Sequence, residues 1–262
     1  MEPLRPQAGT GRLGGTLVHL RRTGSTNDAA REAARRGAVA GTVFIAEEQE
    51  AGRGRQGRTW VSAPGLSLTL SALVRTEPEG FPLLPLVTAV AVCEACEAVA
   101  PVACRIKWPN DVWIDGRKAA GILIEARPQE GWAVIGIGLN VGATAADLGA
   151  DLRDTATSLR IASGESVPRE AVLCALFDRL AERLAGLESG QAPELLDRYR
   201  ERDVLTGRDI EWTAAGESHA GRVQGIDERG NLVVVAAGGE LVTLEAGEVH
   251  LDGRRQTADG RR

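Results

Sequence analysis

Three glycines and three arginines are interleaved in residues 52–58, whose sequence is GRGRQGR. Arginine carries a permanent planar charge whose donors suit phosphate and carboxylate, and glycine lets the backbone bend and approach a ligand closely. The apolar, β-branched run 42–46 before this segment predicts a buried strand, and Trp60 follows it. We therefore expect a cationic loop at a strand end that binds an anion such as a nucleotide phosphate. An RNA contact or a solvated loop is the plainer alternative.

A second group of polar side chains lies where a helix is predicted to begin. Residues 23–28 read TGSTND, an alanine- and arginine-rich run covers 29–36, and Gly37 follows. Ser25 or Thr26 is suited to the N-cap, Asp28 to the positive end of the helix and Gly37 to its C-terminal stop. Capping alone explains such a start, but its free N–H groups and hydroxyls also suit a polar ligand.

A lysine and two glycines mark a third candidate region. The motif KWPND covers 107–111, and Asp115-Gly116 after it is a strong hairpin signal. Lys118 then enters a small-residue run, from which its side chain can point along the sheet toward a site. The strand predicted over 132–141 contains Gly136 and Gly138, and interior strand glycines often mark the close approach of a ligand.

The elements that must hold these residues form an α+β pattern. Strands are predicted at 16–20, 42–46, 66–74, 102–108, 111–114, 119–126 and 132–141, and helices at 29–36, 83–100, 167–187 and 193–200. The strands include hairpins and the helices are clustered, so we expect a mixed β-sheet with packed helices rather than a doubly wound fold.

The character of the chain changes near Val204. Short strands predicted at 209–212, 218–226, 231–236 and 240–245 are separated by glycine-rich turns, which indicates a small C-terminal β-barrel. We expect a disordered N-terminus at 1–15, a catalytic domain at 16–203, the small domain at 204–252 and a disordered tail at 253–262. We expect no helix-turn-helix domain, because the part before the first predicted strand is short.

Composition narrows the functional classes. The chain has 262 residues, 43% hydrophobic and 26% charged, with a net charge of −5, which argues against wholesale nucleic-acid binding. We find no apolar run approaching a membrane span and no signal-peptide core, and so expect a cytoplasmic protein without membrane contact.

Cys93 and Cys96 have C-x-x-C spacing, but they lie in the apolar helical stretch and no second such pair exists. Packing therefore explains them better than a metal or redox site.

Four separated motifs together resemble the biotin protein ligases, also called biotin–[acetyl-CoA-carboxylase] ligases. They are TGSTND at 23–28, the segment 48–60 with its arginine loop, KWPND at 107–111 with GRKAAGILIE at 116–125, and GIGLNV at 136–141. The resemblance covers residues 16–252. It implies a biotin/lipoate ligase-like catalytic domain and an SH3-like C-terminal barrel.

The resemblance also implies a two-step reaction. Biotin's carboxylate is activated with Mg-ATP as biotinyl-5′-AMP, and a lysine of a biotin carboxyl carrier domain of acetyl-CoA carboxylase or a related carboxylase then attacks this anhydride. Both steps gather negative charge, so fixed cations and N–H donors should matter more than a protein nucleophile. That expectation suits a chain whose three histidines lie outside all four motifs.

Site residues follow from the resemblance position by position. The biotin contacts implied are Ser25, Thr26, Asn27, Gln49, Arg53, Gly54, Arg55 and Lys118. The nucleotide contacts implied are Arg55, Arg58, Trp60, Asn110 and Asn140. Lys118 and Arg55 are implied as catalytic, and Asp111 as a residue that assists Mg²⁺.

Two departures and three alternatives accompany the resemblance. Gln56 replaces a basic residue of some relatives, and Asp252 stands where some have an arginine that reaches ATP, which puts an ATP role of the barrel in doubt.

A lipoate or octanoate ligase is the nearest alternative function. A non-catalytic nucleic-acid-binding regulator and a sensor without catalysis are the other two. Some relatives carry an N-terminal DNA-binding domain; here we expect a ligase without DNA binding, as a monomer or homodimer.

Overall fold

The computed structural model describes residues 13–61, 64–214 and 216–251. The disorder predicted for the two ends therefore falls mostly outside the described residues, as does Asp252. Within them, Leu13 packs into the hydrophobic core.

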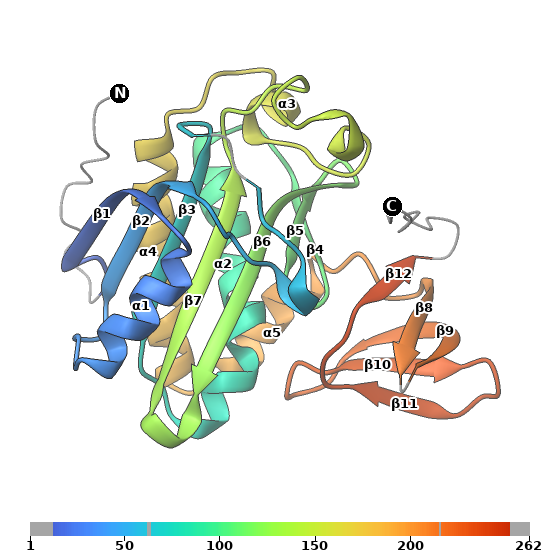
Figure 1. The fold of residues 1–262 in the computed structure, drawn as a ribbon. Coiled ribbons are helices and arrows are strands. Elements are labelled where there is room, and N and C mark those ends of the chain that lie inside the picture. Colours follow the sequence, from blue (N-terminus) through green and yellow to red (C-terminus); the bar gives the residue numbers. More distant parts are fainter. Residues whose placement is uncertain (1–12, 62–63, 215, 252–262) are drawn as a thin grey trace.

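A seven-stranded mixed sheet forms the centre of the larger part of the molecule (Figure 1). Its strands are β1 (Thr16–Thr23), β2 (Thr42–Gln49), β3 (Ser67–Val74), β4 (Cys104–Lys107), β5 (Asp111–Ile114), β6 (Arg117–Arg127) and β7 (Trp132–Asn140). The order is β1-β2-β3-β7-β6-β5-β4, with β1 and β2 parallel and the other neighbours antiparallel. The mixed α+β architecture predicted from sequence is confirmed.

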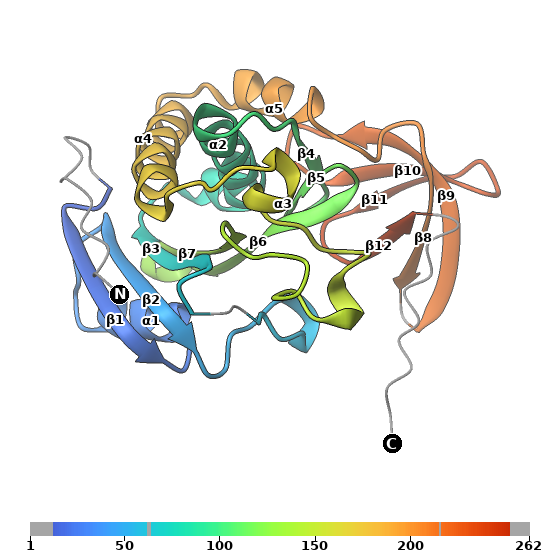
Figure 2. The same ribbon diagram turned by 90° about the horizontal axis from the view of Figure 1, so that it is seen from above.

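Helices cover both faces of this sheet (Figure 2). They are α1 (Thr26–Arg35), α2 (Leu84–Val99), α3 (Leu159–Ser163), α4 (Arg169–Glu188) and α5 (Ala192–Arg200), with 3-10 turns at Arg55–Gly57, Pro78–Leu83, Pro128–Glu130 and Ala150–Leu152. Helix α1 packs on one face through Ala30 and Ala34 against Phe44 and Leu73. Helices α2, α4 and α5 pack on the other face, over the main core.

Helix α2 is mostly apolar, in keeping with its burial between the sheet and α4. With the preceding turn, the segment Pro78–Val99 is long and apolar enough to cross a membrane, which corrects the expectation that no run approaches that length. Most of its apolar window, 67%, is buried inside the protein, which is the behaviour of a core helix. Cys93 and Cys96 lie on this helix, and both are unpaired and fully buried.

Two turns position the site, and both match the sequence predictions. Asp115 and Gly116 have φ values of 50° and 72° and join β5 to β6, as the hairpin signal predicts. Ser25 occupies the N-cap position of α1, although its side chain makes no capping hydrogen bond. Ser25 therefore has the extended backbone conformation of an N-cap residue, but its hydroxyl does not stabilise the helix end.

The C-terminal part forms a separate five-stranded antiparallel sheet. Its strands are β8 (Asp209–Ala214), β9 (Glu217–Ile226), β10 (Leu232–Ala236), β11 (Leu241–Leu244) and β12 (Val249–Leu251). In the order β11-β10-β9-β8-β12 the two end strands do not pair with each other, so the described pairings do not close the predicted barrel. The fifth strand, β12, was missed from sequence because it has only three residues.

Candidate functional site

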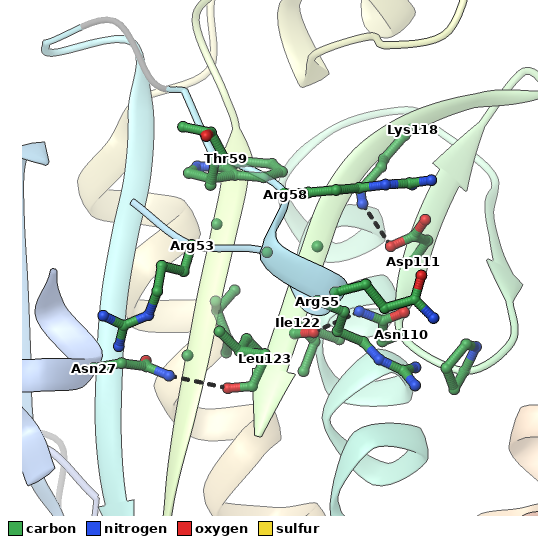
Figure 3. A pocket seen from close by; sticks show the side chains of 18 of the residues that line it. Asn27, Arg53, Arg55, Arg58, Thr59, Asn110, Asp111, Lys118, Ile122 and Leu123 are labelled. Carbon is green, nitrogen blue, oxygen red and sulfur yellow. Dashed lines mark hydrogen bonds and ion pairs between the residues drawn. The ribbon is translucent and has the colours of Figure 1, made fainter. Parts of the chain in front are cut away.

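One cavity gathers almost all the residues singled out from the sequence (Figure 3). It lies over β6 and β7, between the N-terminal end of α1, the arginine loop and the segment 107–111. The predicted residues that line it are Ser25, Thr26, Asn27, Gln49, Arg53, Gly54, Arg55, Arg58, Trp60, Asn110, Asp111 and Lys118. Segments that are about ninety residues apart along the chain thus meet over β7 and β6, because these two strands lie near the middle of the sheet.

Three glycines of β6 and β7 make the floor of the cavity. A Cβ atom on Gly136 would lie 2.2 Å from Oδ1 of Asn27, and one on Gly138 would lie 2.3 Å from the Trp60 ring. A Cβ on Gly121 would lie 3.1 Å from the Lys118 side chain. The glycines of β7 therefore let other side chains lie directly on the strand, which is the close approach predicted for them.

The end of the cavity next to α1 is lined by neutral polar side chains and by Arg53, whose charge is paired with Asp28. Gln49 accepts hydrogen bonds at Oε1 from the Thr26 N–H (2.8 Å) and the Thr26 hydroxyl (3.1 Å). Ser71 Oγ, fully buried on β3, lies 2.7 Å from the Thr26 hydroxyl and 2.6 Å from Oδ1 of Asn27. This network holds the side chains rigidly, so they form a preorganised set of donors and acceptors for a neutral polar group.

The opposite end is cationic. Arg55, Arg58, Lys107 and Lys118 all line it, together with the carboxylates of Asp111 and Glu248. Lys118 Nζ lies 2.6 Å from Asp111 Oδ1, and Arg58 forms an ion pair with Glu248, which comes from the C-terminal sheet. The four cations outnumber the two carboxylates, so this end has a net positive charge and suits an anionic ligand.

Burial makes two of these cations readier to bind an anion. Desolvation lowers the pKa of Arg55 and of Lys107, and the nearby Asp111 and Glu248 only partly oppose that effect. A charge that has already lost part of its hydration gives up less water when an anion binds. The cationic end is therefore prepared for a phosphate or carboxylate, while both side chains remain the sources of its charge.

Backbone hydrogen bonds join the two arms of the arginine loop. The Trp60 N–H donates to the Gly52 carbonyl (2.9 Å) and the Gly54 N–H donates to the Arg58 carbonyl (2.7 Å). Gln56 and Gly57 turn the chain with φ values of 54° and 75°. The loop thereby places Arg55 and Arg58 toward Lys118 and Asn110, and Arg53 toward Asn27 (Figure 3).

Asn110 and Asp111 are held at the start of β5. Asn110 Nδ2 donates to the Ile122 carbonyl (2.6 Å), which fastens the turn to β6. Asp111 was considered as a metal ligand, and here it faces Lys118. Among the described residues no group of three or more His, Cys, Asp or Glu side chains is arranged to hold a metal ion.

Asn140 is the one predicted residue outside this cavity. It is buried at the end of β7, where its Nδ2 donates to the Thr157 carbonyl (3.0 Å). It lines an adjoining cavity that shares Trp60, Lys118 and Asp111 with the first and is closed by the segment 143–156. Trp60 lines both spaces, and its ring lies over Gly138, two residues before Asn140 on β7.

Three contributors were missed from the sequence. Ser71 looked like one of the alternating small residues of a strand, and Glu248 lies in the small domain, far along the chain from the other site residues. Lys107 was noted only as part of its motif. The segment 107–111 is dense in functional groups, which was the signal available for Lys107, whereas Ser71 and Glu248 carried none.

Comparison with known proteins gives a consistent result. Residues 19–141 match the biotin/lipoate A/B protein ligase family, and residues 207–252 match the biotin protein ligase C-terminal domain. The biotin–[acetyl-CoA-carboxylase] ligase of Mycobacterium tuberculosis is 34% identical, over 87% of this chain and 85% of that protein. The bifunctional ligase/repressor BirA of Bacillus spizizenii is 40% identical over 166 residues, 62% of this chain, and the match spans about half, 51%, of that relative.

A solved structure agrees with the fold. The biotin protein ligase from Aquifex aeolicus in complex with biotin and ATP superposes with a TM-score of 0.78 at 28% identity. The superposition covers 90% of this chain and 98% of that one, so it includes both the mixed sheet and the C-terminal sheet.

Proposed function

The chain belongs to the biotin protein ligase family, and from this premise we propose that it is a biotin–[biotin carboxyl carrier protein] ligase. In the proposed reaction, ATP activates biotin as biotinyl-5′-AMP with release of pyrophosphate. The biotinyl group then passes to a specific lysine of a carrier domain of acetyl-CoA carboxylase or a related carboxylase, and AMP leaves.

The observation that carries the proposal is the division of one cavity into two ends. The neutral side chains of Thr26, Asn27 and Gln49, beside charged groups that are paired with one another, suit the neutral, hydrogen-bonding ring of biotin. The cationic end, with Arg55 and Lys118, suits a carboxylate beside an α-phosphate. A substrate that is neutral at one end and anionic at the other matches this polarity, whereas a uniformly charged ligand does not.

Within this proposal the cations lower the barrier by charge neutralisation and alignment. Lys118 lies between the two reacting anions, the carboxylate of biotin and the α-phosphate, so it reduces their repulsion as the carboxylate oxygen attacks phosphorus. Arg55 stabilises the charge that develops on the phosphate oxygens. The ligand competes with Asp111 for Lys118, so its binding and the release of that ion pair are coupled.

The remaining predicted contacts have separate tasks in this proposal. Ser25 adds a hydroxyl to the biotin end, and the main chain at Arg53 and Gly54 closes over the carboxylate. Trp60 provides an aromatic face for adenine, and Arg58 and Asn110 hold the nucleotide. Asn140 contacts the nucleotide from the adjoining cavity, past Trp60.

Mg²⁺ fits the site as a companion of ATP. Magnesium is commonly held by one or two carboxylates together with phosphate oxygens and water. Asp111 and Glu248 are the carboxylates that line the cationic end, and we propose Asp111 as the residue that contacts the ion. When bound, the ion would neutralise part of the phosphate charge.

The proposal extends to the organisation of the molecule. We assign residues 16–203 to the catalytic domain and 204–252 to an SH3-like domain, whose short antiparallel strands support that class. We propose a cytoplasmic enzyme, in keeping with four unpaired cysteines, that acts as a monomer or homodimer. The net charge of −5 supports a role without DNA binding for these residues.

Pyrophosphate exchange into ATP tests the proposal. The assay is run with biotin, with lipoate and with neither acid, for the wild type and for Lys118→Ala. We expect exchange that requires biotin and falls at least about a hundredfold in the variant, because one fixed charge at a reacting centre is worth several kcal/mol. Exchange with lipoate alone would show that lipoate is the substrate in place of biotin. The absence of exchange with any acid would contradict the proposal that the protein is an adenylating enzyme.

A further inference from the structure

The three arginines of the loop do not share one role. Arg53 lies in a bridge with Thr59, whereas Arg55 begins the 3-10 turn Arg55–Gly57, so the change of backbone conformation between them lets their side chains point in different directions. Arg55 and Arg58 lie toward the cationic end, near Asp111 and Glu248. Arg53 points away from them, toward the N-terminal end of α1 (Figure 3).

Arg53 is held by two carboxylates of the protein itself. Its Nη1 and Nη2 lie 2.6 Å and 2.8 Å from the two oxygens of Asp28, which is the bidentate geometry of a strong arginine–carboxylate pair. Its Nη2 also lies 3.5 Å from Oε2 of Glu125 on β6. Hydrogen bonds from Arg53 hold the pKa of Asp28 below its usual value, in agreement with this geometry.

A fourth residue makes this group electrically neutral. Arg31 of α1 pairs with Asp28 and lies 2.7 Å from Oε1 of Glu125. Two arginines thus face two carboxylates, and the charge of Arg53 is already compensated. A guanidinium in this position has little net charge to offer a substrate carboxylate, in contrast to Arg55.

The same group reaches the biotin end of the cavity. Glu125 accepts a hydrogen bond from Nδ2 of Asn27 (2.7 Å), and Asn27 is 4% exposed and lies against Gly136. One carboxylate therefore orients the predicted ring contact and also helps hold the loop. Asp28 is the next residue along α1, so both acids are placed by elements that form the cavity wall.

We propose that Asp28 and Glu125 are positioning residues that latch the arginine loop over the cavity through the side chain of Arg53. Arg53 is then an internal anchor of the loop, and its side chain is not a ligand of biotin. The inference rests on the proposed function only in naming biotin and its adenylate as the molecules beneath the loop.

Two measurements test the latch. The first is amide hydrogen exchange of residues 51–59 in the ligand-free protein, which needs no activity. The second is the rate at which preformed biotinyl-5′-AMP leaves the enzyme. Asp28→Asn and Arg53→Gln should each speed both by about fivefold, the effect of one good, partly exposed ion pair. The double variant should be no faster than Arg53→Gln alone, because Asp28 acts on the loop through Arg53.

Two control variants separate the latch from a general loss of structure. Asp28→Glu keeps the carboxylate and should stay within about twofold of the wild type. Glu32→Gln removes an ion pair with Arg36 on the outer part of the same helix and should change neither rate. Arg53→Gln does not alter α1, so an equal effect from Arg53→Gln and Asp28→Asn cannot come from weakening the helix.

The competing role of Arg53 predicts opposite signs. If its side chain binds the biotin carboxylate, Asp28→Asn frees it and tightens biotin binding, while Arg53→Gln weakens it; that pattern would overturn the latch. Unchanged loop exchange in both variants would also overturn it. A wild type that forms no adenylate, combined with faster loop exchange in the variants, would reject the proposed function and leave the latch standing.

Discussion

Lys118 and Asp111 illustrate how a single contact prepares this site. They face each other at 2.6 Å across the β5–β6 hairpin, and Lys118 Nζ also lies 5.9 Å from the centre of the Trp60 ring. The lysine is therefore oriented before any ligand arrives, and the aromatic face stabilises its charge. Fixed orientation is what electrostatic catalysis requires, because a preoriented charge needs no reorganisation during the reaction.

The close approach of Asn27 to Gly136 leads to a testable prediction. Gly136→Ala places a methyl group where Oδ1 of Asn27 now lies, at 2.2 Å, so Asn27 must leave its position and lose its contact with Ser71. We expect the KM for biotin to rise at least about tenfold, since a buried hydrogen-bonding group is displaced from the ligand. Steady-state kinetics with biotin as the varied substrate measure the effect.

Gly142→Ala is the matched control for this variant. It lies just beyond the same strand, and an added Cβ there meets its nearest atom at an ordinary 3.6 Å. Its KM should equal that of the wild type. Equal KM values for both variants would show that Asn27 does not contact biotin.

At the scale of elements, the parallel pair β1–β2 is tied to helix α4 by one carboxylate. Glu47 on β2 lies 2.9 Å from Nε2 of His19 on β1 and 2.8 Å from Nη1 of Arg169, the first residue of α4. Burial acts to raise the pKa of Glu47, but the hydrogen bonds from Arg169 and His19 outweigh it and hold the pKa below its usual value. This ion group therefore joins an edge strand to a helix on the far face of the sheet.

The depressed pKa of Glu47 predicts a pH-dependent stability. A carboxylate with a lower pKa in the folded state stabilises the fold above its unfolded pKa, near the ordinary value of 4.5, and this contribution is lost as pH falls through the folded value. Glu47→Gln should lower the free energy of unfolding by about 2 kcal/mol at pH 7 and by progressively less below pH about 4.5. Urea unfolding between pH 7 and pH about 3 measures both changes.

An exposed pair between β1 and the residue that follows β2 provides the comparison. Glu50 pairs with Arg22 at 3.0 Å, and both side chains are more than half exposed. Glu50→Gln should change stability by less than about 0.5 kcal/mol at any pH. A Glu47→Gln variant that behaves like Glu50→Gln would show that the buried group does not join these elements.

At the scale of the whole molecule, the C-terminal sheet is attached to the mixed sheet next to the site. Trp108 Nε1 donates to the Gly230 carbonyl (2.9 Å), and Gly230 lies against Leu83 and Leu86 at the start of α2. The Arg58–Glu248 ion pair adds a contact at the cavity itself. The small sheet therefore contributes to the site through its position as well as through Glu248.

Two glycines with a similar positive φ distinguish the effect of this attachment from the effect of turn geometry. Gly230 and Gly239 have φ values of 79° and 84°, but only Gly230 has neighbours, with Leu86 at 3.0 Å from an added Cβ. Gly239→Ala should cost about 1 kcal/mol through strain, and Gly230→Ala about 1–3 kcal/mol more through overpacking. Thermal unfolding measures the costs, and equal costs would show that the attachment at Gly230 is loose.

Much of the fold could be predicted from the sequence because it depends on neighbours along the chain. The hairpin at Asp115-Gly116, the helix that starts after Ser25 and the glycines of β7 each follow from local backbone preferences or a short periodicity. The four motifs also sufficed to identify the family. Strand β12 was missed because three residues contain too little periodicity to be recognised.

Only the tertiary structure decided how the site residues are distributed. Which strands are neighbours, and where a side chain points, depends on packing between segments far apart in sequence. For that reason the sequence did not indicate that Ser71 and Glu248 belong to the site, that Asn140 lines the adjoining cavity, or that Arg53 pairs with Asp28. Residue types and spacing determined which chemistry the chain can perform, and the sheet order determined which residues stand close enough to perform it.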